Sequence, residues 1–532
     1  MSLFKTWLFA IAVSAMFFST PCEAHAQEFS GRDRYETAQL EAVAAFPSGS
    51  DTAILASGEG WADALSATSL AGALDAPMLF TPSNSLSPYT QAALAQLKPS
   101  TVILIGSETA LDDTVMHQVS QHPGVKSTVR LGGNNRIETQ MEIYDYGKDR
   151  GPWTSDTVIV ANAWGFADAL TASPFTYKNG CPLFLVNGSF SSEQERALLE
   201  LMPSQVLIMG SENVVDEYTY GYMEALSLHS SPDGTVLRFA GTDRFDTNLR
   251  FARWAVSEGH LSWGRVAVTR SDAPFDALAG AALQGTRSSV LILASSKYDA
   301  TVQELIGQRG RVSDVSFFGG TPSVPASLRN YIKSYLGFYI PQADVWTSCV
   351  LQYPELPTGC EALALTNALS AYGYRPGKFE IVDQYLPYSY HDFVTCYVGN
   401  PYSSGGAWNS CCAPAIVRAA NNYLTAHGSP LHPYEITGTS FENLLTYIER
   451  GYPVIAWSTV NQVSPNIIWA SQWYNNHRYD LWNDTHTVVL SGFNRVSGTV
   501  TIADSISGYV TMSASRFKWI WATTGSQAVV IM

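Results

Sequence analysis

The sequence predicts an α/β chain in which three tandem doubly wound parallel-sheet units precede a separate C-terminal domain. Two observations carry this prediction. Three successive segments share the same three motifs in the same order, which identifies an internal repeat. Each segment also alternates short apolar strands with helices, a pattern that indicates a parallel sheet with helices packed on its faces.

The repeat is defined by three motifs. The first is a glycine followed three residues later by Arg, an apolar residue, an acidic residue and Thr, and it begins at Gly31, Gly133 and Gly241. The second is an aromatic residue before an Asp-Ala-Leu motif, with the aspartates Asp63, Asp168 and Asp276. The third is an apolar strand that ends at Gly106, Gly210 and Gly319. These motifs place the repeats at 27–127, 128–234 and 235–337.

The first repeat illustrates the expected elements. Helical periodicity and a Ser-Pro helix start predict helices over 36–46, 62–74 and 87–97. Short apolar runs predict strands over 52–56, 78–81 and 101–105. Each repeat is therefore expected to form a small doubly wound unit around three buried strands.

At these motifs residues 29–337 resemble the cell wall binding repeat (type 2) of Gram-positive surface proteins. The resemblance implies a three-lobed module that holds the protein non-covalently on the cell wall by gripping an anionic polymer. No strand runs into a Gly-x-Gly-x-x-Gly turn, so dinucleotide binding is not expected.

The conserved-looking charges of the motifs allow two interpretations. The three motif aspartates lie where a loop opens a helix, a position typical of capping and of compensating the helix dipole. Arg34, Arg136 and Arg244 could pair with those aspartates or with the acidic residues Glu36, Glu138 and Asp246. If the module binds an anion, these arginines and the nearby helix N-termini are the available donors.

The N-terminus has the pattern of a secretory signal over residues 1–26. Lys5 precedes an apolar run, and Ala24-His25-Ala26 forms a small-x-small cleavage site, so the mature chain is expected to start at Gln27. No stretch approaches the roughly 20 uninterrupted apolar residues of a membrane span. The protein is expected to be secreted and held at the cell wall or cell surface. A net charge of −15 argues against nucleic acid as a partner.

A new domain is expected over 345–532, where the repeat pattern stops. Cys360 precedes a helical run that ends at Gly373, and a cysteine at a helix N-terminus is favoured as thiolate. His486 opens an apolar strand, and Asp504 ends the next strand, so the two can face each other. Gln352 lies upstream of the cysteine and can offer its amide to an oxyanion.

These residues resemble the papain-like cysteine peptidases, most closely the secreted relatives of the bacteriocin-processing (double-glycine) peptidases. The resemblance rests on Gln352, the Leu-Pro-Thr-Gly-Cys-Glu block at Cys360, His486 and Asp504. It implies an α+β papain-like domain in which Cys360 is the nucleophile, His486 the general base and then acid, Asp504 its orienter and Gln352 an oxyanion donor. The implied substrate is a protein or peptide.

Alternatives remain open at this point. The same residues would serve a peptidoglycan hydrolase that cuts stem peptides or the muramoyl amide, and a catalytically inactive domain would leave a surface adhesin. For the base, His486 competes with His391, His427, His432 and His477. Cys411 and Cys412 lack the Cys-x-x-Cys spacing of a zinc site, so a local disulfide that involves Cys396 is expected instead, and neither metal nor cofactor is.

Overall fold

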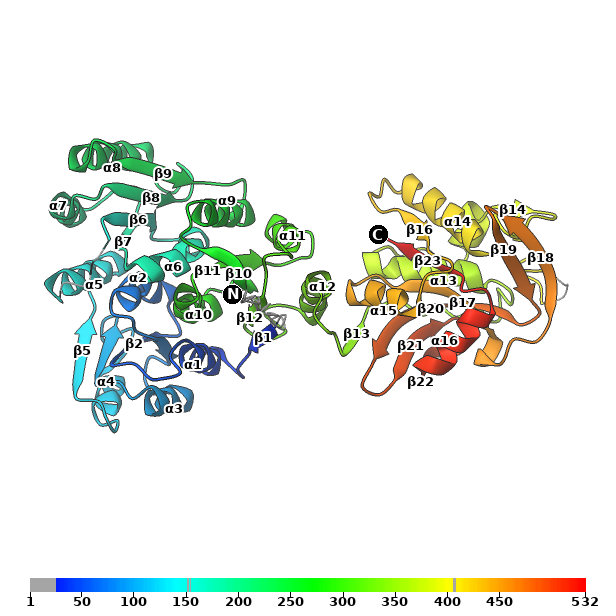
Figure 1. The fold of residues 1–532 in the computed structure, drawn as a ribbon, viewed down its shortest axis with the longest axis horizontal. Helices are drawn as coiled ribbons and strands as arrows, with labels where there is room; N and C mark the ends of the chain where they lie inside the picture. Colours follow the sequence, from blue (N-terminus) through cyan, green and yellow to red (C-terminus); the bar gives the residue numbers. More distant parts are fainter. Residues whose placement is uncertain (1–24, 151–152, 154, 405–407) are drawn as a thin grey trace, which may run out of the picture.

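The structure, a computed structural model, describes residues 25–150, 153, 155–404 and 408–532 (Figure 1). Three α/β lobes form one body, and a C-terminal sheet with its helices forms a second (Figure 1). The predicted fold class, parallel-sheet repeats followed by a separate α+β domain, is confirmed. The predicted signal segment lies outside the described residues except for its last two positions. Within the described part of the chain, no helix combines the length and apolar character needed to cross a membrane.

The first lobe is a parallel sheet of four strands in the order β3-β2-β4-β5. Its strands are β2 (Thr52–Ser57), β3 (Met78–Thr81), β4 (Thr101–Ile105) and β5 (Ser127–Leu131). Its helices are α1 (Arg34–Ala45), α2 (Trp61–Ala73), α3 (Pro88–Leu97) and α4 (Asp113–Ser120). The fourth strand was not expected, because β5 lies at the sheet edge, is largely half-exposed and lacks a continuous apolar run.

The second and third lobes repeat this plan, with strand orders β7-β6-β8-β9 and β11-β10-β12-β1. The second lobe consists of α5 (Arg136–Arg150), β6 (Thr157–Asn162), α6 (Ala167–Asn179), β7 (Leu183–Val186), α7 (Ser192–Leu201), β8 (Gln205–Met209), α8 (Glu217–Ser230) and β9 (Thr235–Phe239). The third consists of α9 (Arg244–Ser257), β10 (Ser262–Arg270), α10 (Phe275–Thr286), β11 (Ser289–Ala294), α11 (Ala300–Gly307), β12 (Asp314–Phe318) and α12 (Ala326–Leu336), with β1 (His25–Phe29) from the start of the chain.

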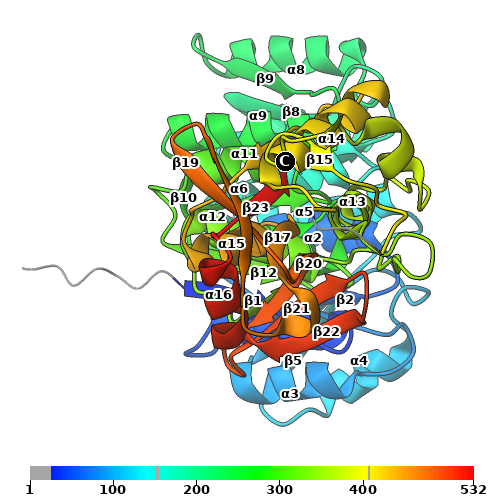
Figure 2. The same ribbon diagram turned by 90° about the vertical axis from the view of Figure 1, so that its right-hand side faces the viewer.

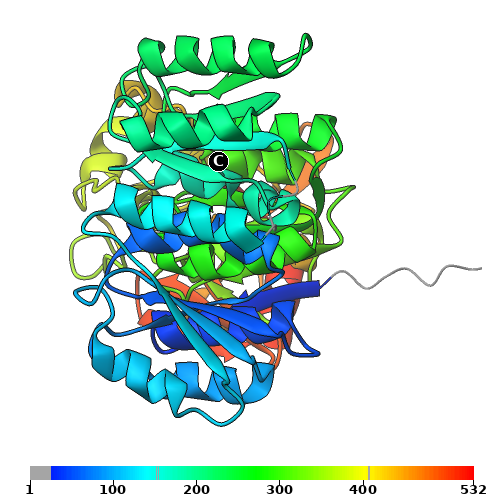
Figure 3. The same ribbon diagram turned by 90° about the vertical axis from the view of Figure 1, so that its left-hand side faces the viewer.

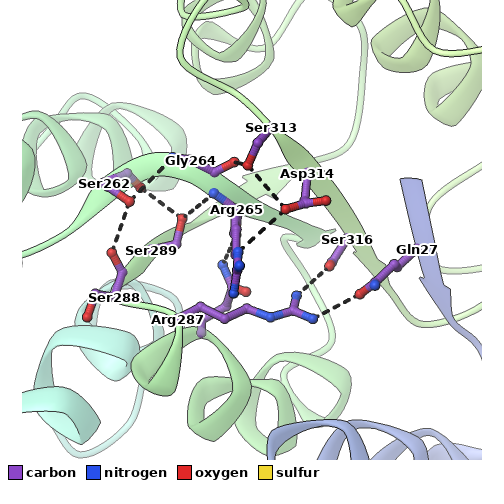
Figure 4. Close-up of polar contacts among 11 residues, drawn as sticks. Gln27, Ser262, Gly264, Arg265, Arg287, Ser288, Ser289, Ser313, Asp314 and Ser316 are labelled. Carbon is purple, nitrogen blue, oxygen red and sulfur yellow. Dashed lines mark hydrogen bonds and ion pairs between the residues drawn. The ribbon is translucent and has the colours of Figure 1, made fainter. Parts of the chain in front are cut away.

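The three lobes close into a ring through β1. The fourth strand of each of the first two sheets comes from the segment that leads into the next repeat, and the third sheet receives β1 instead. β1 pairs in parallel with β12 over all five residues, from His25 with Asp314 to Phe29 with Phe318. Arg287 ties this edge down by donating to Ser316 Oγ and Gln27 Oε1, both at 2.9 Å (Figure 4). Figures 2 and 3 show the N-terminal strand beside the third lobe.

The first repeat motif, which begins at Gly31, Gly133 and Gly241, forms the start of a helix in each lobe. Asp33, Asn135 and Asp243 precede α1, α5 and α9, and each accepts hydrogen bonds from backbone N–H groups two and three residues later. The acidic residue of the motif accepts from a backbone N–H in the preceding loop: Arg32 to Glu36, Asn134 to Glu138 and Thr242 to Asp246. These reciprocal bonds satisfy helix-terminal donors in the manner of a capping box.

The motif arginines and aspartates meet across the seams between lobes. Arg136 lies near Asp63, Arg244 near Asp168 and Arg34 near Asp276, so each arginine faces the aspartate of a neighbouring repeat. Burial raises the pKa of all three aspartates, and the facing arginine lowers it. Each guanidinium also donates to a backbone carbonyl of its own repeat, at Gly58, Ala163 or Ser271. The aspartates therefore do not cap their helices, which begin without a side-chain cap.

The C-terminal body is built on a seven-stranded sheet whose neighbouring strands are antiparallel, ordered β16-β23-β17-β20-β21-β22, with β13 also paired to β20. The strands are β13 (Gln342–Asp344), β16 (Pro433–Glu435), β17 (Val454–Thr459), β20 (Thr485–Asn494), β21 (Thr499–Asp504), β22 (Gly508–Ser513) and β23 (Ala528–Ile531). The helices are α13 (Cys360–Leu369), α14 (Ala413–Ala426), α15 (Phe441–Glu449) and α16 (Ala514–Thr523). Two small sheets complete it: β14 (Tyr388–Ser389) with β15 (Tyr397–Val398), and β18 (Ile468–Tyr474) with β19 (His477–Trp482).

The two bodies are joined by more than a covalent link. β13 leaves the third lobe and pairs with Gly492, Phe493 and Asn494 of β20, so the connecting segment is part of the second sheet. Glu449 accepts from Ser334 Oγ of α12 at 3.0 Å and from Arg495 at 2.8 Å. The bond from Ser334 crosses the junction, while Arg495 of the C-terminal body holds the Glu449 carboxylate in place.

One buried carboxyl group distinguishes the first repeat. Glu41 of α1 is fully buried, and among the described residues neither of its oxygens has a hydrogen-bond partner. The corresponding positions of the other repeats, seven residues after the motif arginine, are the buried apolar residues Ile143 and Phe251. Burial raises the pKa of Glu41 well above its ordinary 4.5, and nearby Asp276 raises it further.

Replacing this carboxyl group should stabilise the protein above acid pH. Glu41 keeps its proton to higher pH in the native state than in the unfolded chain, so the free energy of unfolding falls as pH rises above 4.5. We expect Glu41→Met to raise it by about 1–3 kcal/mol at pH 8 and by less at pH 4.5. Denaturant unfolding of the full chain at both pH values measures this. Glu108→Met, which replaces an exposed carboxylate, is the control, and an equal effect of the two variants at pH 8 would contradict the assignment.

Candidate active site

The predicted site residues gather at one cavity of about 220 Å³ in the C-terminal body. Cys360, His486 and Gln352 line it, and Asp504 lies behind His486. The four come from three places in the fold: the first residue of α13, the facing ends of β20 and β21, and the loop before α13. His486 is the one histidine among the described residues that line the cavity.

Cys360 is the first residue of α13, after Gly359, and it is 6% exposed. The backbone of Thr487, the residue that follows His486, lies close enough to the sulfur to lower the pKa of the Cys360 thiol. The thiol therefore lies against the strand that carries the histidine. The helix runs to Leu369 and continues as a single 3₁₀ turn to Gly373, whose φ of 88° ends it as the sequence predicts.

The thiol form of Cys360 is favoured in this structure. Burial raises the pKa of Cys360 well above its ordinary 9.0, the charge of Glu361 raises it further, and the Thr487 backbone opposes both. This differs from the expectation of a thiolate at the helix N-terminus, because the sulfur is shielded from water and touches a carboxyl group. Removal of the thiol proton by a base is therefore part of any reaction here.

His486 and Asp504 form a buried pair. Nε2 of His486 is 2.7 Å from Oδ1 of Asp504, and the two side chains are 1% and 2% exposed. Burial acts to raise the pKa of Asp504, but His486 and the N–H groups of Ile506 and Ser507 outweigh it and hold the pKa below its usual value. A carboxylate at Nε2 leaves Nδ1 of the ring to exchange protons on the cavity side.

Gln352 is held firmly beside the cavity. Its Nε2 donates to the carbonyl of Pro357 at 2.9 Å, and its Oε1 accepts from Ser505 Oγ at 2.7 Å. Its backbone N–H donates to Ser505 O at 2.8 Å, so the loop before α13 is tied to the end of β21. These bonds fix the orientation of the amide next to the first turn of α13.

Glu361 is a site residue that the sequence interpretation missed. Its carboxyl group is fully buried and accepts from Ser410 Oγ at 2.5 Å and the Cys411 N–H at 3.0 Å through one oxygen. The other oxygen is 3.2 Å from the Cys360 sulfur. Glu361 therefore ties the segment before α14 to Cys360. In the sequence it ends the Leu-Pro-Thr-Gly-Cys-Glu block that carries the resemblance, but an acidic residue in a first helical turn is common, so no role was predicted for it.

The aromatic rim of the cavity was also missed. Tyr353, Trp408, Trp469 and Trp482 line it, and they come from three separate segments of the domain. Their shared position depends on tertiary folding, and in the sequence a high content of Tyr and Trp fits core packing equally well.

The remaining cysteines are all free among the described residues, so the expected disulfide at Cys396 is not present. Cys411 and Cys412 are buried in separate apolar clusters, while Cys396 Sγ accepts from Arg418 at 3.2 Å. No group of three or more His, Cys, Asp or Glu side chains suited to a metal occurs within the described residues.

Each of the two bodies matches a known protein family. Residues 28–116, 130–220 and 238–329 match the cell wall binding domain 2 (CWB2) family, and these segments make up just over half of the chain. The chain belongs to this cell wall binding family. Residues 339–529, which hold the candidate site, match the Peptidase_C39 like family. The three predicted repeats and the peptidase-like domain are thereby confirmed.

Two curated relatives match somewhat more than half of the chain. The chain is 28% identical over 306 residues to N-acetylmuramoyl-L-alanine amidase LytC of Bacillus subtilis (strain 168), covering 57% of each protein. It is 26% identical over 318 residues to the Amidase enhancer of the same organism, covering 60% of this chain and 41% of that protein. The chain thus spans about half the length of these curated relatives. Because the peptidase-like segment is shorter than either alignment, both include residues of the repeats.

The fold also matches a solved structure, Cwp6 from Clostridium difficile, with a TM-score of 0.53 at 21% identity. The match covers 66% of this chain and 58% of that one. It shows a shared fold.

The contact between Glu361 and Cys360 can be tested by titrating the thiol. Glu361→Gln keeps an oxygen for Ser410 and Cys411 but removes the charge beside the sulfur, so the pKa of Cys360 should fall. We expect the pH profile of iodoacetamide labelling of Cys360, followed by peptide mass spectrometry, to move to lower pH. Glu355→Gln changes an exposed carboxylate in the loop before α13 and should leave the profile in place. Identical profiles for both variants would contradict the role of Glu361.

Proposed function

We propose that the protein is a secreted, cell-wall-attached cysteine peptidase. The observation that supports this most directly is that the Cys360 thiol and the buried His486–Asp504 pair meet at one cavity in a Peptidase_C39-like domain. In this proposal Cys360 is the nucleophile, His486 the general base and acid, Asp504 the orienter of His486, and Gln352 an oxyanion donor. The three cell wall binding repeats attach the peptidase domain to the cell wall.

The reaction follows from the positions of these groups. His486 Nδ1 takes the proton of the Cys360 thiol as the sulfur attacks the carbonyl carbon of an amide bond. The oxygen of the tetrahedral intermediate receives hydrogen bonds from the Gln352 amide and from N–H groups of the first turn of α13. The C–N bond breaks, His486 gives its proton to the leaving amine, and water then hydrolyses the thioester with His486 again as base.

The resting thiol makes Asp504 important for rate. Since the proton must move to His486 during attack, the positive imidazolium that forms needs a charged partner at Nε2, which Asp504 supplies at 2.7 Å. The N–H groups of Ile506 and Ser507 fix that carboxylate in turn.

For wall attachment, we propose that the polymer lies in the grooves at the seams between lobes. A groove of about 650 Å³ is lined by Trp61, Trp164 and Arg244, and a neighbouring groove of about 420 Å³ is lined by Trp61 and Arg136. The Arg136 guanidinium lies 5.3 Å from the Trp61 ring and 4.2 Å from the Trp164 ring, and Trp164 is 63% exposed. Guanidinium groups suit an anionic polymer, and exposed indole faces suit its sugar rings.

A second candidate function is peptidoglycan hydrolysis by the same residues. The likeness to an N-acetylmuramoyl-L-alanine amidase favours it. That alignment includes repeat residues, so the likeness fits a shared wall-binding module as well as a shared activity.

Replacing the nucleophile tests the central proposal. We expect Cys360→Ala to abolish hydrolysis of a fluorogenic peptide library, and Asp504→Asn to lower kcat about 10²- to 10⁴-fold. Cys396→Ala, which changes a free and partly exposed cysteine, should retain activity. Unchanged hydrolysis by Cys360→Ala would refute the proposal. Release of muropeptides from purified wall by the wild type alone would favour the second candidate.

The groove proposal predicts a loss of wall affinity without loss of peptidase activity. Trp164→Ala removes an exposed ring beside Arg136 and should weaken co-sedimentation with purified cell wall by about 10-fold. Tyr218→Ala changes a side chain of similar exposure on α8, outside the grooves, and serves as the control. Equal binding by the two variants would place the polymer elsewhere.

A further inference from the structure

Four aromatic side chains line the cavity that holds Cys360 and His486. Tyr353, Trp408 and Trp469 are 54%, 39% and 46% exposed. Among the described lining residues there is no Asp, Glu, Lys or Arg.

Most polar side chains of the lining are already engaged in holding the wall of the cavity together. Ser410 Oγ bonds to Glu361, Thr485 Oγ1 to Trp482 O and Thr358 Oγ1 to carbonyl groups of 400–403. The Asn409 amide bonds to Asn400 and Ser403, and Asn483 Oδ1 accepts from Ile467. The lining side chains left to a ligand are therefore mainly aromatic and aliphatic.

The aromatic surface continues away from the cavity along the β18–β19 hairpin, which lies at the outer edge of the C-terminal body (Figure 1). Trp469 and Trp482 come from this hairpin, and Trp473 farther along it is 70% exposed. The charges of β19 are paired with each other, Arg478 Nε with Asp480 Oδ1 at 2.8 Å. The hairpin thus carries a further exposed aromatic ring beyond the cavity, beside an ion pair whose charges balance.

From these observations we propose that the site takes an extended polypeptide segment with neutral apolar or aromatic side chains around the scissile bond. This inference rests on the proposed peptidase function and names its substrate class. The β18–β19 hairpin, through Trp469, is the element that selects such segments.

The stem peptides of the cell wall are disfavoured as substrates by the same features. They carry several free carboxylates and an ammonium or second carboxylate close to each amide bond. A charge placed against this lining would lose water without gaining a charged partner, which costs free energy in proportion to its burial. The net charge of −15 adds a further repulsion against acidic ligands. An unfolded or loop segment of a surface protein has no such penalty.

The test uses the full chain and three substrates: a fluorogenic peptide with Phe, Leu, Ala and Gly around the cleaved bond, the same peptide with Glu or Lys at those positions, and purified dimeric muropeptides. We expect the charged peptides to show kcat/KM about 10- to 100-fold lower than the neutral one, and the muropeptides to be left intact. Trp469→Ala should lower kcat/KM for the neutral peptide about 10-fold through KM, with kcat nearly unchanged. Trp519→Ala is the control, because Trp519 is also 46% exposed but lies on α16 away from the cavity.

The outcomes test the substrate class, the role of the hairpin and the peptidase proposal separately. Cys360-dependent cleavage of charged and neutral peptides at equal rates would overturn the substrate class while leaving the peptidase proposal standing. Equal effects of Trp469→Ala and Trp519→Ala would overturn the role of the hairpin. Cys360-dependent release from muropeptides, with no peptide cleaved, would refute the peptidase proposal itself.

Discussion

The arrangement of the C-terminal body depends on the register of one strand, β20. His486 is its second residue and pairs with Ser458 of β17, while farther along Leu490 pairs with Ile502 of β21. The backbone of the same strand contacts the Cys360 sulfur through Thr487, and its last residues pair with β13. Because side chains alternate between the two faces of a strand, a slip of one residue would turn His486 away from both Cys360 and Asp504. The continuous burial of β20 resists that slip.

Much of this could be predicted from the sequence, because it depends on local pattern. The alternating apolar strands and helices of the repeats are short-range features, and so are the helix that begins at Cys360 and the strand that begins at His486. The pairing of His486 with Asp504 could be anticipated because one turn joins their strands, which leaves few registers. Glu361 and the aromatic rim could not be anticipated in the same way, since their roles appear only where segments 40 or more residues apart meet, as Ser410 does with Glu361.

The ring of three lobes was also only partly predictable from the sequence. The three repeats were recognisable, but the exchange of strands between them was not, because an edge strand such as β5 has no apolar run and β1 finds its partner at the far end of the module. This exchange makes the lobes interdependent. The motif arginines at the seams add to that interdependence, since each lies near the half-buried aspartate of a neighbouring repeat and lowers the pKa of that aspartate. The grooves at the seams thus exist only in the closed module.

The pairing of β13 with β20 has a consequence for how the two bodies work together. A flexible linker would let a tethered enzyme search the volume around its attachment point. Here the connecting segment is a strand of the C-terminal sheet, and Glu449 bonds across the junction to Ser334. The cavity therefore keeps a fixed direction relative to the seam grooves of the lobes. Under the proposed function, a peptidase fixed in this way would not reach along the wall for its substrate. It would act on chains that come to it, which fits the uncharged, mobile polypeptide segment proposed as its substrate.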